Sequence, residues 1–193
     1  MMKKISNLVG VAFLTCLLLT PKTWAHGDAP SKIQGAEVNL VERNHAFAGE
    51  ILGNPIFGVF NERTATSTVQ LRHNGKTISL TIGEIGHQYG GNLSDFITDR
   101  EKGEIQSTTT EIRFLGAEKT GPTTGRIALS IDQNVVPIQV TGQSFENGHF
   151  QHPKFEATFN GKSVSFEFSG EACFSYSANL AMMIFGSFSH LLK

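Results

Sequence analysis

The sequence is poor in cysteine, with only Cys16 and Cys173 among 193 residues. Cys16 lies in an apolar stretch near the start that has the pattern of an export signal. The single thiol that remains after export cannot form an intramolecular disulfide, and it excludes a zinc site built on a cysteine cluster. The exported chain must therefore be stabilised by packing of its apolar side chains.

Positive charge is also scarce. The chain has 16 Lys and Arg against 17 Asp and Glu, without a run of basic residues. Three of the basic residues and none of the acidic residues precede residue 26, so residues 26–193 carry a net charge of −4. Nucleic acids and anionic lipid surfaces require concentrated positive charge. We therefore expect no nucleic-acid partner.

The first 25 residues have the three parts of a secretory signal peptide. Two lysines near the start are followed by Leu8–Leu19, an apolar run of 12 residues. Thr23-Trp24-Ala25 then places small residues three before and one before a cleavage site. The apolar run is shorter than the roughly 20 residues of a membrane-spanning helix. We predict cleavage before His26, an exported protein (periplasmic or secreted) with no integral membrane segment after cleavage, and a single β-rich domain over residues 26–193.

Alternation of apolar and polar residues, which is typical of half-buried strands, dominates the remainder of the chain. Two Asn-Gly pairs, at 74–75 and 160–161, interrupt this alternation where a two-residue type I′ hairpin turn is favoured. About nine or ten short strands at this spacing predict an all-β fold, an antiparallel sandwich or barrel. The two hairpins predict the following cross-strand pairs: Leu71 with Ile78, Val69 with Leu80, Phe155 with Phe166, and Ala157 with Val164.

Three further features qualify this pattern. Pro137 cannot donate to a ladder, which predicts an edge position for its strand. Residues 87–103 are polar and contain glycine, so we expect a long loop there, with a short helix from Ser94.

Residues 173–193 carry apolar side chains at helical spacing, namely Leu180, Ile184, Phe188 and Leu191. This spacing predicts a C-terminal α-helix that lays one apolar stripe over the sheet or across a barrel mouth.

An N-terminal histidine would give the exported protein a candidate copper site. The free amine and the ring Nδ1 of such a residue chelate one metal, and a second imidazole completes a three-nitrogen site that suits copper. In this respect His26-Gly27 resembles the start of bacterial lytic polysaccharide monooxygenases, a resemblance that covers two residues. It implies a copper cofactor held by His26, and His87 is the imidazole that we would pair with it.

The segment Cys173-Phe174-Ser175-Tyr176-Ser177-Ala178, at the start of the expected helix, resembles the nucleophile segment of papain-like proteases. The resemblance implies a thiol hydrolase with Cys173 as its catalytic residue. In that family the histidine lies far downstream, whereas only 20 residues follow Cys173 here. The base would have to be His87, His149 or His152, in a permuted order.

These features favour a non-catalytic binding or interaction protein, exported from the cytoplasm, with an unknown protein or small molecule as its ligand. The expected contact surface is a barrel mouth or the 87–103 segment, with His87, Gln88, Tyr89 and Asp95 as candidate binding residues. A copper-binding protein that uses His26 and a thiol hydrolase that uses Cys173 are the two alternatives. Whether the protein is an enzyme stays open.

Overall fold

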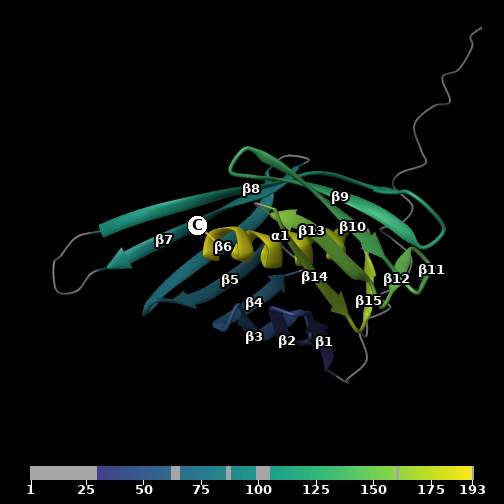
Figure 1. The fold of residues 1–193 in the computed structure, drawn as a ribbon, viewed down its shortest axis with the longest axis horizontal. Helices are drawn as coiled ribbons and strands as arrows, with labels where there is room; N and C mark the ends of the chain where they lie inside the picture. Colours follow the sequence, from purple (N-terminus) through teal and green to yellow (C-terminus); the bar gives the residue numbers. More distant parts are fainter. Residues whose placement is uncertain (1–29, 62–65, 86–87, 99–104, 160, 193) are drawn as a thin grey trace, which may run out of the picture.

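The computed structural model describes residues 30–61, 66–85, 88–98, 105–159 and 161–192. In this part of the chain fifteen strands precede a single C-terminal helix (Figure 1). The elements are β1 (Ser31–Gln34), β2 (Val38–Arg43), β3 (Ala46–Ile51), β4 (Asn54–Asn61), β5 (Thr66–His73), β6 (Lys76–Ile85), β7 (Gln88–Thr98), β8 (Ile105–Lys119), β9 (Thr124–Ile131), β10 (Asn134–Thr141), β11 (Ser144–Glu146), β12 (His149–Gln151), β13 (Lys154–Phe159), β14 (Lys162–Phe168), β15 (Glu171–Cys173) and α1 (Phe174–Leu191).

Twelve of these strands pair antiparallel in one curled sheet, in the order β1-β14-β13-β10-β9-β8-β7-β6-β5-β4-β3-β2. β1 pairs along its whole length with β2, and it also meets β14 through the two residue pairs Ile33–Phe168 and Gln34–Glu167. The remaining strands form a small sheet in the order β11-β12-β15. The expected all-β, antiparallel fold with a C-terminal helix is confirmed, although the sequence predicted fewer strands.

Two-residue turns set the register of the sheet. Both predicted Asn-Gly hairpins are confirmed, because the four predicted cross-strand pairs are present. Other hairpins use turns in which both central residues have a positive φ, as a type I′ turn requires. Examples are Asn44-His45, Leu52-Gly53, Asp132-Gln133 and Asn147-Gly148.

The helix α1 lies within the curl of the large sheet, where it builds the centre of the core (Figure 1). Its cap is Cys173, whose backbone is extended and whose Sγ accepts a hydrogen bond from the Tyr176 N–H at 3.5 Å. Every residue from Tyr176 to Phe188 is buried. The expected helix is therefore confirmed, but the expectation of one buried stripe is wrong, since strands surround the helix on all sides over these turns.

Polar side chains on α1 are accommodated by specific partners on the sheet. The Ser67 hydroxyl on β5 donates to the Asn179 Oδ1 at 3.1 Å, and both residues are buried. Near the other end of the helix, the His190 Nδ1 lies 3.2 Å from the Thr110 Oγ1 on β8. A buried amide costs stability unless it is hydrogen-bonded, so these contacts fix the helix in one orientation.

No helix in the described part of the chain has the length and hydropathy needed to span a membrane.

The loop expected over residues 87–103 is wrong for most of its length, because residues 88–98 form strand β7. β7 pairs with β6 on one side and with β8 on the other, and Ser94, the expected helix start, faces Ser79 and Thr109. Pairing on both sides satisfies the main-chain groups of β7, and this context overrides its weak intrinsic strand propensity. Residues 86–87 and 99–104 lie outside the described residues.

Candidate binding site in the sheet wall

Strand β10 pairs along its full length with only one of its two neighbouring strands. All eight of its residues pair with β9, whereas only Gln139, Val140 and Thr141 pair with β13. The predicted edge position of the Pro137 strand is therefore wrong for the strand as a whole, since β10 is internal to the sheet. The regular pairs with β13 begin only at Gln139, since Pro137 has no N–H to donate.

The direction of the main-chain groups follows from the register. Asn134 and Ile131 flank the two-residue Asp132-Gln133 turn, in which φ is 48° and 66°. Residues that flank such a turn form a hydrogen-bonded pair, and the bonding direction alternates along the strand. Asn134 and Val136 therefore bond to β9, whereas Val135 and Pro137 direct their main-chain groups toward β13.

Strand β13 presents its own main chain to the same space. Gln139 directs its main-chain groups toward β13 and pairs with Glu156, so Glu156 and, two residues later, Thr158 direct theirs toward β10. Pro137 faces Thr158 in this register and has no N–H to donate to it, so the regular ladder ends at the Gln139–Glu156 pair.

A hollow of about 220 Å³, which we call the wall opening, lies where β10 begins and β13 ends. Helix α1 supplies Ser189, and its C-cap residue Leu192 also lines the hollow. Val135 is 65% exposed at the rim, the largest exposure among the exposed large apolar residues of the described chain. Within the described ranges the lining residues carry no charge, and they are Ile131, Asn134, Val135, Val136, Thr158, Phe159, Ser189 and Leu192.

Cys173 lies in a different part of the molecule, at the junction of the small sheet and α1. Its direct cross-strand neighbour on β12 is His149, one of the three histidines that the sequence offered as a base. Glu146 faces His149 from β11, so a carboxylate, an imidazole and a thiol occupy one row of the small sheet. The His149 Nδ1 lies 3.0 Å from the Asn147 carbonyl oxygen, and Cys173 is half-buried.

A buried carboxylate lies near the start of α1. Glu42 on β2 is 2% exposed, and its Oε1 accepts a hydrogen bond of 2.8 Å from the His45 N–H. The His45 ring packs edge-on against the rings of Phe60 and Tyr176. Because the carboxylate accepts from the N–H of a turn residue with positive φ, we assign this cluster to holding the β2–β3 turn.

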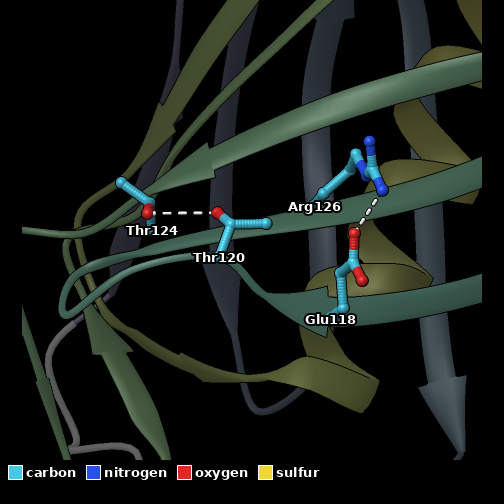
Figure 2. A network of polar contacts seen from close by, with 4 residues as sticks. All are labelled: Glu118, Thr120, Thr124 and Arg126. Atoms are coloured by element: carbon cyan, nitrogen blue, oxygen red, sulfur yellow. Dashed lines mark hydrogen bonds and ion pairs between the residues drawn. The ribbon is translucent and has the colours of Figure 1, made fainter.

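A second hollow, of about 250 Å³, lies over the outer surface of β8 and β9, where β8 has a bulge between Phe114 and Gly116. Two of its lining residues, Glu118 and Arg126, form an ion pair across the strands, and the Thr120 hydroxyl donates to the Thr124 Oγ1 at 3.1 Å in the adjoining turn (Figure 2). Both ion-pair side chains are more than half exposed. An exposed pair is worth about 0–1 kcal/mol and leaves its charges solvated, so this hollow is a surface feature of the hairpin.

The sequence-predicted site residues do not converge on the wall opening. His26 and His87 lie outside the described residues, so the copper site stays a prediction. Gln88, Tyr89 and Asp95 belong to β7, and binding by them is untested. In the described ranges, no group of three or more His, Cys, Asp or Glu side chains is placed to hold a metal ion. The only sequence signal for the wall opening was Pro137.

Comparisons of the chain with protein-family models, with curated proteins and with solved structures give no match.

Proposed function

We propose that this chain is an exported, periplasmic or secreted, non-catalytic binding protein, and that it binds its ligand at the wall opening. Within the part of the chain that the structure describes, the curled sheet leaves no free interior around the middle of α1, because every helix residue from Tyr176 to Phe188 is buried. A ligand that entered the sheet would have to displace the core. The binding surface is therefore on the outside of the molecule or in its wall.

The hollow at the start of β10 carries the proposal. Residues of two neighbouring strands and of the end of α1 line it, and Val135 at its rim is 65% exposed. Its exposed lining is more polar than apolar, and the polar groups come from Asn134, Thr158 and Ser189 among others. Ligand sites are concave and use a small number of placed polar groups to orient the ligand.

Site-specific photo-crosslinking in the native compartment tests this proposal. A benzophenone side chain at position 135 should give a defined adduct, and Ser189→Phe, which fills the hollow, should remove that adduct. The same photo-reactive residue at Lys154, an exposed position on β13 beyond the opening, is the matched control. Equal adducts at 135 and 154, or an adduct that survives Ser189→Phe, would contradict binding at the wall opening.

A second candidate function is thiol chemistry at Cys173. The observation that favours it is the cross-strand pairing of Cys173 with His149, since a hydrolase of this kind needs a base beside its thiol. The Cys173 sulfur would attack an acyl carbon while His149 takes the thiol proton, and His149 would return that proton to the leaving group as its bond to the acyl carbon breaks. Water would then hydrolyse the thioester, which releases the acid and restores the thiol. Alkylation by iodoacetamide should then be slower in His149→Ala than in Gln151→Ala, a control on the same strand. Equal alkylation rates would reject a role for His149 as base.

A further inference from the structure

We infer that the outer surface of β2, β3 and β4 docks the protein peripherally on a bilayer that contains anionic phospholipids. This surface shares no residue with the wall opening, and its role is independent of the ligand bound there. Its centre consists of outward-facing apolar side chains, which we call the apolar face: Val41, Ala46, Ala48, Pro55, Phe57 and Val59.

The register of the sheet places the exposed apolar side chains side by side. β3 pairs with β2 through Ala48 and Val41, and with β4 through Ala48 and Phe57, so these three residues form one row across three strands. Val41 is 49% exposed and Phe57 is 48% exposed. Directly opposite side chains lie about 4.5–5.5 Å apart at their Cβ atoms. The row is therefore contiguous, unlike the single apolar residues that are scattered over most protein surfaces.

Positive charge surrounds the apolar face. Lys32 on β1 pairs with Val41, Arg43 follows Val41 by two residues on β2, and Arg72 lies on β5, the strand beyond β4. Glu50 is the only acidic residue among the described outward-facing positions of β1–β5. Three basic residues and one acidic residue give this surface a net charge of +2, whereas residues 26–193 carry −4. The fold thus concentrates positive charge that no run of basic residues shows in the sequence.

The basic side chains of this surface are free to bind an anion. Lys32, Arg43 and Arg72 have no ion-pair partner among the residues that the structure describes. Four basic residues elsewhere in the sheet each pair with a glutamate, namely Arg113, Arg126, Lys154 and Lys162. Long basic side chains lay their stems along apolar surface and keep their charges in water. The three cations therefore reach lipid phosphates while the apolar face contacts the acyl chains.

A bilayer fits this surface better than a polypeptide does. β2, β3 and β4 are paired on both sides, so they offer no free edge to an extended peptide. A second copy would bring two surfaces of like charge together. A stable protein complex buries roughly 800 Å² on each partner, whereas the row offers mainly one half-exposed phenylalanine and one half-exposed valine. Peripheral lipid binding combines apolar insertion with attraction of basic side chains to anionic headgroups, and both are present here.

A single tryptophan reports insertion of the apolar face. The only tryptophan of the sequence, Trp24, precedes the predicted cleavage site, so Phe57→Trp gives the exported protein one fluorophore. Vesicles of phosphatidylglycerol and phosphatidylcholine in equal parts should shift its emission to shorter wavelength in a saturable manner, and vesicles of phosphatidylcholine alone should not. Leu115→Trp is the matched control, because Leu115 is 47% exposed on β8, outside the apolar face. Its emission should stay unchanged with both kinds of vesicle.

Charge variants of the Phe57→Trp protein test the role of the cations. Replacing Arg43 and Arg72 by Gln should weaken vesicle binding about 25-fold, since each basic residue near an anionic surface contributes a factor of about five. Replacing the ion-paired Arg113 and Arg126 by Gln removes the same net charge and should leave binding nearly unchanged. Melting temperatures identify any variant that fails to fold. Cosedimentation of the unsubstituted protein with the same vesicles, weakened by about 0.5 M salt, measures binding without any substitution.

Equal binding to the two kinds of vesicle, equal emission shifts from positions 57 and 115, or equal binding by the two double variants would overturn the inference. A shift with poly-glutamate but none with vesicles would overturn it as well, and would assign this surface to an acidic polypeptide. None of these results changes the adduct expected at position 135, so the proposed function stands or fails on its own test.

Discussion

Replacement of Phe166 by alanine tests the packing of the core around α1. Phe166 is 1% exposed, and its ring stacks on Phe155 with the centroids 4.7 Å apart. It also contacts Phe185 of the helix at 5.3 Å, so the ring joins β13, β14 and α1. Removing a buried phenylalanine costs about 3–5 kcal/mol, through lost transfer energy and the cavity left behind. This is a large share of the roughly 5–15 kcal/mol that stabilise a typical domain.

Urea denaturation followed by circular dichroism measures the loss. We expect Phe166→Ala to lower the midpoint with little change in slope, and to lower the melting temperature by roughly 6–20 °C for a domain of this size. Phe57→Ala is the matched control, because Phe57 is 48% exposed on the outer face of β4. It should cost less than about 1 kcal/mol. Equal costs for the two variants would refute the assignment of Phe166 to the core.

Three further predictions follow from the same account. Deletion from Ser177 onward should unfold or aggregate the protein, because it removes the centre of the core, and a truncated monomer with unchanged melting temperature would contradict this. Asn179→Ala should destabilise the protein by about 1–3 kcal/mol, and its coupling to Ser67→Ala in a double-mutant cycle should be measurable; simple additivity would show that the buried hydrogen bond contributes nothing. The intact mass of the exported protein should correspond to a chain that starts at His26. That protein should bind Cu(II) more tightly than a version with one extra residue before His26. Equal binding by the two proteins would exclude an N-terminal copper chelate.

Local signals were sufficient to predict the hairpins. Asn-Gly fixes a two-residue turn, and alternation on either side then fixes which residues face each other. The turn at Asn44-His45 uses the same backbone geometry with less characteristic residues, so the sequence did not reveal it. This is one reason why the strands were undercounted.

Features that depend on distant partners could not be predicted. The 88–98 segment reads as a loop because its strand conformation is imposed by pairing with β6 and β8 on either side. The polar residues of α1 suggested an exposed face, whereas Asn179 is buried against Ser67 from a strand more than 100 residues earlier. The wall opening is lined by β10, β13 and the end of α1, which are distant in the sequence, and Pro137 indicated a missing donor without showing which strand it would face.

Hydrogen exchange of three backbone amides, followed by NMR, tests the wall opening most directly. The account directs the N–H of Val135, at the rim of the hollow, away from β9, and it places those of Val136 and Ala157 in the ladders to β9 and β14. Paired amides in a core strand exchange only through opening of the structure, whereas unpaired ones exchange freely. We predict that Val135 exchanges at least about a hundredfold faster than Val136 and Ala157. Similar protection of all three amides would contradict an open rim at the start of β10.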